Sequence, residues 1–317
     1  MPDTPENQAE YPQPRSQKPG IGFPLARLVA ILGGSTGALL DLNLGAYRGK
    51  GTGEHGLLRP MMENFQAGDV VLGDGYYASF FLMADLIQRG VDAVFPLHGA
   101  RDCDFRRGHR LGKKDHLVQW MKPQRPAWMD QEMYESYPER LTIRELEVQI
   151  QRAGFRTESR VLATTFLKPK ETTREELAAL YDYRWWVELD LRSIKQVMHM
   201  DILHAKTPEM VRKEIWAHLL AYNLIRKVMA QAAAVHGKNP RRLSFKLALQ
   251  TVESFRQAGA FSESRGACYK QLLWVIASQP VSDRPGRREP RRVKRRPKPF
   301  ARLQKRREVY RREMVAA

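Results

Sequence analysis

Apolar and polar residues follow different patterns along the chain, and these patterns predict the order of the secondary structure elements. Leu25–Leu32 and Ala38–Tyr47 mix apolar and small residues on either side of Gly33–Gly37, which is typical of a β-hairpin. Beyond the hairpin, the apolar spacing predicts helix, short buried strand, helix and strand, in that order. These four elements are expected at Glu54–Phe65, Val70–Leu72, Ser79–Gln88 and Ala93–Leu97.

The rest of the chain is expected to be β-rich first and helical afterwards. Residues 99–168 mostly lack helical periodicity, which predicts a separate β-rich insertion. From Thr172 to about Ala234 the spacing is that of helices, and Thr173–Glu176 has the sequence of a capping box. Within the insertion, alternating apolar residues return at Leu141–Ile150 and Phe155–Phe166.

Basic residues exceed acidic ones, and the excess is concentrated near the C-terminus. The 317 residues carry a formal net charge of +18, and fifteen of the Lys and Arg residues lie between Arg284 and Arg312. Like charges and prolines prevent a buried element between Arg287 and Pro299, so an extended arm is expected. Such an arm binds nucleic acid by releasing counterions from phosphates. The alternative is a solvated tail that serves only solubility.

Composition excludes several classes of protein. A hydrophobic fraction of 43% is enough to form a core, so wholesale disorder is excluded. The apolar stretches are too short or too interrupted for a membrane span, and no signal peptide is visible, so a cytoplasmic chain is expected. Cys103 and Cys268 are too few and too far apart for a thiolate metal site or a disulfide framework. Any metal is therefore expected to have oxygen or nitrogen ligands.

One predicted helix carries four polar side chains on a single face. They are Tyr181, Arg184, Glu188 and Lys195. At about 100° per residue, their side chains fall within an arc of roughly 60°. An exposed helix face with an ordinary ion pair would have the same spacing. However, bulky apolar residues flank the polar face and are expected to be mostly buried, which favours a face that lines a cleft. These residues are Leu180, Trp185, Trp186, Val187, Leu189 and Leu191.

The same segment, Leu180–Lys195, matches the signature Y-x2-R-x3-E-x6-K and resembles the insertion-sequence-four family of bacterial DDE transposases. The resemblance covers roughly residues 3–300 and includes Asp3–Asn7 and Gly68–Asp74. It implies an α/β fold with a ribonuclease H-like core, a β-rich insertion, a helical C-terminal part and a basic extended tail. It also implies metal-dependent cutting and joining of DNA.

The resemblance divides the chain into five segments. The expected order agrees with the pattern of elements predicted above. The segments are an irregular N-terminal segment (1–22), the first part of the core (23–98), the insertion (99–170), the helical second part of the core with the signature helix (171–283), and the DNA-binding tail (284–317).

By resemblance, Asp74 is the second catalytic carboxylate and Glu188 is the third. Together they would bind Mg²⁺ (or Mn²⁺), because these ions prefer oxygen ligands and stabilise the attacking and leaving oxygens of a phosphodiester. Without the resemblance, Asp74 is equally typical of a turn residue. The other signature residues, Tyr181, Arg184 and Lys195, would bind phosphates beside the cleaved end. The expected tail contacts to DNA are Arg291, Arg292, Lys294, Arg295 and Arg296.

The first carboxylate of the triad has no counterpart in this sequence. In the family it lies a little upstream of the segment that occurs here as Asp3–Asn7, so it would precede Met1. We therefore expect a chain that is truncated at its N-terminus, through a misassigned start or as a remnant. In this form, it is expected to be catalytically weak or inactive.

The implied partners are DNA, both transposon ends and target, and a second copy of the chain in a homodimer on paired ends. Two other functions remain as alternatives. The first is a non-catalytic DNA-binding remnant, which would bind DNA without metal and cleave no strand. The second is a dinucleotide-binding oxidoreductase, because Gly51–Gly56 reads G-x-G-x-x-G with Asp74 about 20 residues further on. The polar stretch Gly45–Lys50 argues against the second, since a buried strand should precede such a loop.

Overall fold

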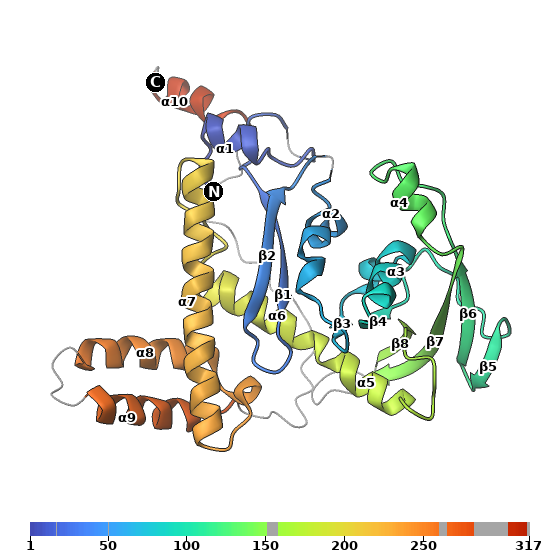
Figure 1. Cartoon of the computed structure of the whole chain (residues 1–317). Coiled ribbons are helices and arrows are strands. Elements are labelled where there is room, and N and C mark those ends of the chain that lie inside the picture. Colours follow the sequence, from blue (N-terminus) through green and yellow to red (C-terminus); the bar gives the residue numbers. More distant parts are fainter. Residues whose placement is uncertain (17, 50, 151–157, 260–264, 282–303, 316–317) are drawn as a thin grey trace. The chain divides into compact units, whose positions relative to one another are not determined.

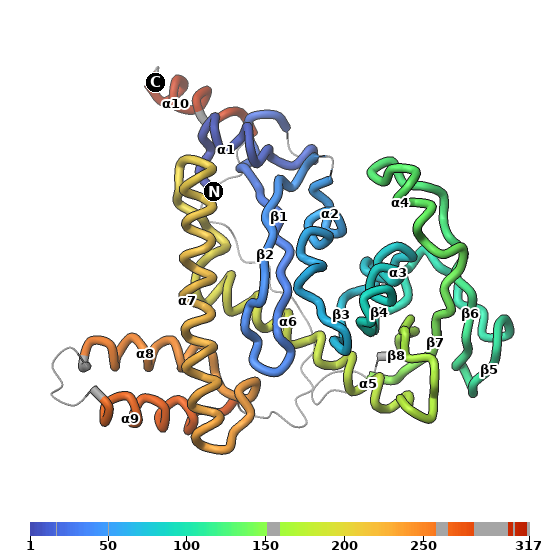
Figure 2. Tube along the Cα trace, in the orientation of Figure 1, coloured from blue at the N-terminus to red at the C-terminus, as the bar shows by residue number. Residues whose placement is uncertain are grey.

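The chain forms two compact units, which are described separately below (Figures 1 and 2). A computed structural model describes residues 1–16, 18–49, 51–150, 158–259, 265–281 and 304–315. None of the helices in these ranges combines the length and the apolar character that a bilayer span requires. Of the described residues, the first unit comprises those within 1–61, 190–281 and 304–315, and the second comprises those within 62–189.

The first unit is built on a β-hairpin and a long helix. Strands β1 (Ala26–Leu32) and β2 (Leu39–Ala46) pair antiparallel, which confirms the predicted hairpin. Helix α7 (Pro208–Val235) runs beside the hairpin (Figure 1). Its buried face contributes Ile215 and Leu219, among others, to the core of this unit. Around them lie α1 (Pro5–Glu10), α2 (Glu54–Leu58), α8 (Phe245–Gly259), α9 (Arg265–Ala277) and α10 (Arg307–Val315).

Polar side chains of α7 hold the turn of the hairpin. The Tyr222 hydroxyl donates a hydrogen bond to the carbonyl of Gly37 at 2.6 Å. The side-chain amide of Asn223 exchanges two hydrogen bonds with the backbone of Leu39, at 2.8 and 2.9 Å. Gly37 has a φ of 74°, in the left-handed region that favours glycine. A Cβ at this position would also collide with the Arg241 guanidinium.

The second unit contains a six-stranded mixed sheet of order β3-β4-β8-β7-β6-β5. Strands β3 and β4 are parallel, and the other neighbouring pairs are antiparallel. Helix α3 (Phe80–Gln88) connects β3 to β4, and α4 (Gln131–Ser136) lies between β6 and β7 in the sequence. The strands are β3 (Val70–Leu72), β4 (Asp92–Pro96), β5 (His109–Gly112), β6 (Asp115–Met121), β7 (Arg140–Ile150) and β8 (Glu158–Thr164).

The sheet differs from the prediction in two respects. The strands of the predicted insertion do not form a sheet of their own, because β8 pairs with β4, for example at Ala163 and Phe95. The cross-strand pairing of β8 therefore extends the sheet that β3 and β4 begin. In addition, β3 was predicted to be buried, but it is an edge strand whose Val70 is exposed. An edge strand has a neighbour on one side only.

Helices were predicted correctly in type but not in continuity. The predicted helix Glu54–Phe65 is α-helical only to Leu58 and then becomes a 3₁₀-helix (Arg59–Asn64), because Pro60 has no N–H for the α-helical pattern. The predicted helical stretch after Thr172 is also interrupted. It consists of α5 (Arg174–Asp182), α6 (Arg184–Arg192), a π-helical turn (Ser193–Val197), a non-helical connection and α7.

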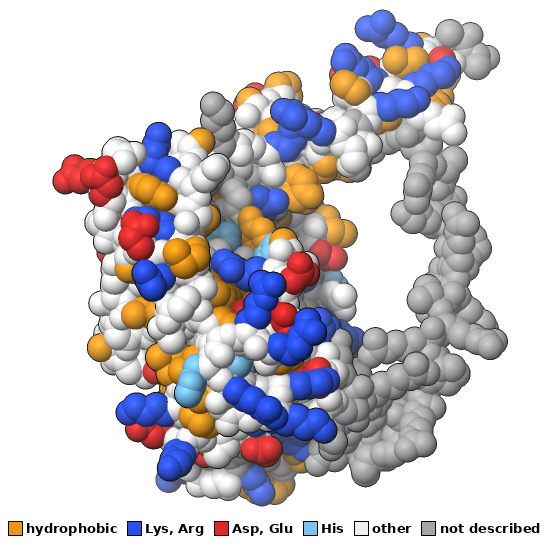
Figure 3. Space-filling model, turned by 90° about the vertical axis from the view of Figure 1, so that its right-hand side faces the viewer, with side chains coloured by type: hydrophobic (Ala, Val, Ile, Leu, Met, Phe, Trp, Pro, Cys, Tyr) orange, Lys and Arg blue, Asp and Glu red, His pale blue; other side chains and the backbone are white. Residues whose placement is uncertain are grey.

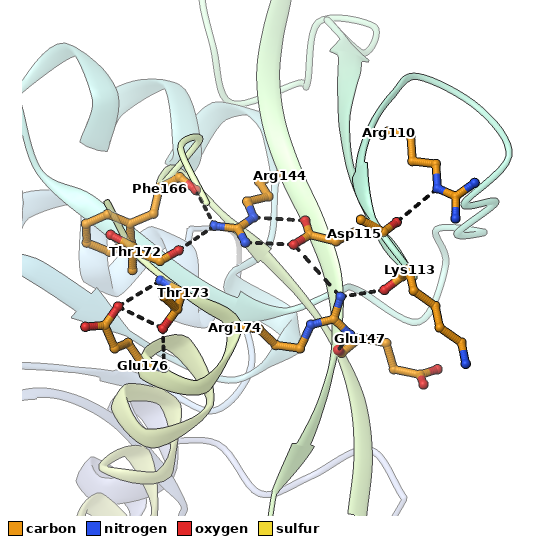
Figure 4. A network of polar contacts seen from close by, with 11 residues as sticks. Arg110, Lys113, Asp115, Arg144, Glu147, Phe166, Thr172, Thr173, Arg174 and Glu176 are labelled. Atoms are coloured by element: carbon orange, nitrogen blue, oxygen red, sulfur yellow. Dashed lines mark hydrogen bonds and ion pairs between the residues drawn. The ribbon is translucent and has the colours of Figure 1, made fainter. Parts of the chain in front are cut away.

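A buried ion pair anchors the start of α5 to the sheet (Figure 4). Arg144 on β7 binds Asp115 on β6 through two hydrogen bonds, at 2.9 and 2.7 Å. Its third nitrogen donates to the carbonyl of Thr172 at 2.8 Å. Directly after this residue, Thr173 and Glu176 form the capping box that the sequence predicts. The sheet thereby fixes the point at which α5, the helix that carries Tyr181, begins.

Candidate active site

Asp74 lies directly after the edge strand β3, as predicted. Its Oδ1 accepts a hydrogen bond from the Tyr76 backbone N–H at 2.8 Å, so the carboxylate caps a short 3₁₀-helix (Gly75–Tyr77). The turn role that the sequence left open is therefore real. The residue is nevertheless exposed, so its carboxylate remains accessible to solvent and ions.

Three signature residues lie around the junction of α5 and α6. The Tyr181 side chain is buried, with 5% of its surface exposed, and belongs to the same buried apolar cluster as Leu146 and Leu162 of the sheet. Arg184 places its guanidinium carbon 5.7 Å from the centre of the Tyr181 ring. One nitrogen of Arg184 then binds Glu188 Oε1 at 2.7 Å. Tyr181 is thus a fixed platform beside an arginine and a carboxylate.

The guanidinium of Arg184 has a donor that is not satisfied. Its Nε is buried and has no hydrogen-bond partner among the described residues. A buried donor without a partner is costly, and an arginine with a free side suits a planar anionic ligand such as phosphate. Burial lowers the pKa of Arg184, but Tyr181 and Glu188 together raise it above its ordinary value. The residue is therefore a permanent cation.

The charge of Asp74 acts on the same tyrosine. Burial raises the pKa of Tyr181 above its ordinary value. The positive charges of Arg184 and Arg160 oppose this rise, and the negative charge of Asp74 adds to it. The structure therefore brings Asp74, which is more than one hundred positions away in the sequence, into the electrostatic surroundings of Tyr181. The phenol stays protonated at neutral pH.

Arg160 was not expected from the sequence. It lies on β8, is exposed, and contributes positive charge near Tyr181. A signal existed, because a lone arginine follows Ser159 in a strand that otherwise becomes apolar. A single charged residue on a strand is too common to be assigned a function without knowledge of the strand order.

The remaining predicted residues are less well placed by the structure. Lys195 is exposed and lies in the π-helical turn. The prediction that it shares a helix face with Tyr181, Arg184 and Glu188 assumed a regular rotation of about 100° per residue, and a π-helical turn does not keep that rotation. The flanking apolar residues are only partly buried, whereas mostly buried side chains were expected; the buried residue of α6 is instead Asp190. The tail residues Arg291, Arg292, Lys294, Arg295 and Arg296 lie outside the described residues.

Basic side chains gather on the face shown in Figure 3, on the side of β5 and β6. Several of them lie on the β5–β6 hairpin or immediately before it, and Arg106 has 91% of its side chain exposed. In the sequence this cluster contains two basic pairs separated by a glycine-containing stretch. The DNA contacts expected from the sequence do not include it. The exposed residues are Arg106, Arg107, Arg110, Lys113 and Lys114.

Asp74 and Glu188 carry carboxylates, which are suitable ligands for Mg²⁺ or Mn²⁺. Oxygen ligands are what these cations prefer. Within the described ranges, just one group of three or more His, Cys, Asp or Glu side chains has converging ligand atoms, and it contains neither Asp74 nor Glu188. Asp74 and Glu188 are both exposed, so each carboxylate is accessible to a cation from solvent.

Comparison with known families assigns the chain. Residues 3–224 match the model of the family described as the transposase DDE domain. The chain belongs to this family, which confirms the resemblance found in the sequence. The match includes the stretch Gly51–Gly56, so the dinucleotide-binding alternative loses the motif on which it was based.

Curated relatives agree with the family. The chain is 30% identical over 289 residues to the transposase InsG of insertion sequence element IS4 from Escherichia coli K12, which covers 88% of this chain and 58% of the relative. It is also 42% identical over 65 residues to the transposase of insertion sequence element IS421 from Escherichia coli, which covers 20% of this chain and 18% of the relative. The chain thus spans little more than half of the length of the InsG transposase.

Proposed function

We propose that this chain carries the catalytic site of a transposase, which cuts and joins DNA at the inverted-repeat ends of an insertion sequence. The main observation in support is the grouping of Asp74 with Tyr181, Arg184 and Glu188 in one unit. We further propose that the sheet belongs to a ribonuclease H-like core, since the parallel pair β3–β4 with α3 between them is compatible with it. The five segments predicted from the sequence are retained as proposed functional segments, although the insertion (99–170) shares its sheet with β3 and β4.

In this proposal, Asp74 and Glu188 hold Mg²⁺ or Mn²⁺. When bound, the cations would supply charge stabilisation for the attacking and leaving oxygens of the phosphodiester. Glu188 is paired with Arg184, so a cation would compete with the guanidinium for the carboxylate. Release of Arg184 from Glu188 would free further donors for a DNA phosphate next to the cleaved bond.

The DNA contacts proposed for this site are cationic and largely independent of base sequence. Arg184 offers its unsatisfied Nε, and Arg160 adds positive charge beside it. The exposed cluster on the β5–β6 hairpin, Lys195 and the basic tail would bind the DNA backbone further away. The assembly that we propose is a homodimer, with two copies of the chain on paired DNA ends.

The proposal is tested with the full chain and duplex DNA that carries the ends flanking its own gene. We expect slow strand cleavage that requires Mg²⁺ or Mn²⁺, because only two of the three catalytic carboxylates are assigned in this sequence. Glu188→Gln should reduce the cleavage rate by roughly a hundredfold or more, because a metal ligand is lost. A titration with Mn²⁺, followed by electron paramagnetic resonance, should show weaker metal binding in the same variant.

Glu209→Gln is a matched control. Glu209 also forms an ion pair four residues along a helix, with Lys213 at 2.6 Å, and both side chains are exposed. This variant should cleave DNA at the wild-type rate. If the wild-type chain binds DNA but neither cleaves it nor binds Mn²⁺ in a Glu188-dependent way, the non-catalytic DNA-binding alternative is correct.

A further inference from the structure

Three side chains with metal-binding atoms converge in the second unit, away from the residues of the candidate active site. They are Cys103, His116 and Glu145, and their ligand atoms all lie within 4.8 Å of one another. His116 on β6 and Glu145 on β7 are direct cross-strand partners, so their side chains project from the same face of the sheet. Cys103 comes from the loop between β4 and β5. The three residues are far apart in the sequence and are brought together by strand pairing.

His116 is oriented as a ligand. Its Nδ1 lies 2.7 Å from the carbonyl oxygen of Arg107, which can only accept, so Nδ1 carries a proton and donates it. In a neutral imidazole, Nε2 then carries the lone pair. That nitrogen lies 3.3 Å from Glu145 Oε2 and 3.9 Å from Cys103 Sγ. Three electron-rich atoms therefore face one point, which requires a proton or a cation between them.

Glu145 is held in a similar way. Its Oε1 accepts a hydrogen bond from the indole N–H of Trp120 at 2.8 Å, which leaves Oε2 directed at His116. Arg101 covers the Trp120 ring, with its guanidinium carbon 3.8 Å from the ring centre. Outer hydrogen bonds that fix a histidine and a carboxylate are characteristic of protein metal sites.

The distances are close to those of a tetrahedral zinc site. Bonds of about 2.0–2.1 Å from zinc to nitrogen and oxygen place these two atoms about 3.3 Å apart, and a bond of about 2.3 Å to sulfur places sulfur about 3.6 Å from nitrogen. The corresponding separations here are 3.3 and 3.9 Å. A thiolate and a carboxylate would also balance the double charge of the cation, so burial of the complex would leave no net charge.

We propose that Cys103, His116 and Glu145 bind a zinc-type divalent cation with a fourth position for water. This site departs from the expectation, drawn from the sequence, that any metal would have only oxygen or nitrogen ligands, because the fold brings Cys103 beside His116 and Glu145. The competing state contains no cation: a protonated His116 pairs with Glu145, and Cys103 remains a thiol. Burial and the negative charge of Glu145 raise the pKa of Cys103 to about 12, so the thiol would persist in that state.

Metal binding would attach the loop before β5 to the sheet. This loop passes very close to β6, because a Cβ on Gly108 would lie only 2.1 Å from the Leu117 carbonyl oxygen. It also carries Arg106 and Arg107, whose side chains are 91% and 85% exposed. The cation would therefore fix the position of a basic loop without contacting the residues around Tyr181.

The test uses Co²⁺ in place of zinc, because a thiolate ligand gives Co²⁺ a sulfur-to-metal charge-transfer absorption that carboxylate ligands do not. The full-length chain should bind one Co²⁺ with this absorption, and Cys103→Ser should abolish it. Cys268→Ser, which changes the other cysteine, should leave the absorption unchanged, as should Glu188→Gln. The last variant separates this site from the proposed catalytic cations.

A second measurement uses protection from proteolysis in place of absorption. Zinc should slow cleavage by trypsin after Arg106 and Arg107, monitored by mass spectrometry, in the wild-type chain but not in Cys103→Ser. The proposal is overturned if saturating Co²⁺ gives no charge-transfer absorption in the wild-type chain. It is also overturned if Cys103→Ser keeps the absorption, or if zinc fails to protect the loop. The pair of His116 and Glu145 would then be an ordinary buried ion pair.

Discussion

Each unit of the molecule buries one aspartate between two arginines, and the two arrangements differ in how the aspartate is balanced. In the first unit, Asp190 binds Arg226 and Arg241, and all three side chains are buried. In the second unit, Asp115 binds Arg144 closely, while the second arginine, Arg174, lies 3.9 Å away and is one-third exposed. The first arrangement therefore buries two complete positive charges, and the second buries only one.

The difference shows what each arrangement holds in place. Arg226 on α7 binds Asp190 on α6 and donates its Nε–H to the Tyr222 hydroxyl at 2.9 Å, so the ion pair of Asp190 joins the end of α6 to α7. Arg144 instead uses its spare nitrogen on the carbonyl of Thr172, so the network around Asp115 joins the sheet to the start of α5. The start of α5 and the end of α6, the two helices that carry Tyr181, Arg184 and Glu188, are thus each fixed by a buried ion pair within one unit.

Removal of the shared aspartate of the first unit is expected to have the largest effect. Asp190→Asn would leave two buried guanidiniums without a counter-charge, and loss of one partner of a buried ion pair costs about 3–5 kcal/mol. The free energy of unfolding of the first unit should fall by this amount or more, and urea denaturation measures it. Asp201→Asn is the control, because Asp201 is exposed in the same unit and its change should stay within about 0.5 kcal/mol. Equal effects of the two variants would contradict the prediction.

Arg144→Met should have a smaller but still large effect. The variant keeps an unbranched apolar stem and leaves Asp115 buried without its close partner, at a cost of about 3 kcal/mol. Arg174 can partly replace Arg144, because it already lies 3.9 Å from the carboxylate. The midpoint of thermal unfolding is the measurement.

A double variant sharpens this comparison. Arg144→Met combined with Asp115→Leu removes both charges, and the replacement of a buried ion pair by apolar residues is often neutral or stabilising. The double variant should therefore be more stable than Arg144→Met alone. If it is no more stable, the uncompensated charge of Asp115 is not the cause of the loss.

Local patterns predicted the elements that local interactions determine. The β1–β2 hairpin, the helix α3 and the capping box at Thr173 all follow from short stretches of sequence, and each was predicted within a few residues. The position of Asp74 at the end of a strand was predicted for the same reason. Its closeness to Tyr181 came only from the family resemblance, because no local pattern connects these two residues.

Features that depend on strand order could not be predicted. The pair of Arg144 and Asp115 and the group of Cys103, His116 and Glu145 exist because β6 pairs with β7 in one particular register. A shift by one residue would place these side chains on the opposite face of the sheet. The π-helical turn at Ser193–Val197 could not be predicted either, because the pattern analysis assumed the regular rotation of an α-helix throughout the segment.

The smallest expected effect concerns the N-caps of two helices, α5 in the second unit and α7 in the first. At α5, Thr173 Oγ1 accepts the Glu176 N–H at 3.2 Å, and Glu176 Oε2 accepts the Thr173 N–H at 2.8 Å. At α7, Thr207 makes only a 3.4 Å contact with the Met210 N–H, and Pro208 already favours the helical start.

Thr173→Ala should therefore destabilise its unit by about 1 kcal/mol, the usual cost of losing an N-cap, and Thr207→Ala should cost less. Hydrogen exchange of the first-turn amides of each helix measures both variants directly. If Thr207→Ala destabilises its unit more than Thr173→Ala does, the network around Asp115, and not the capping box, determines where α5 begins.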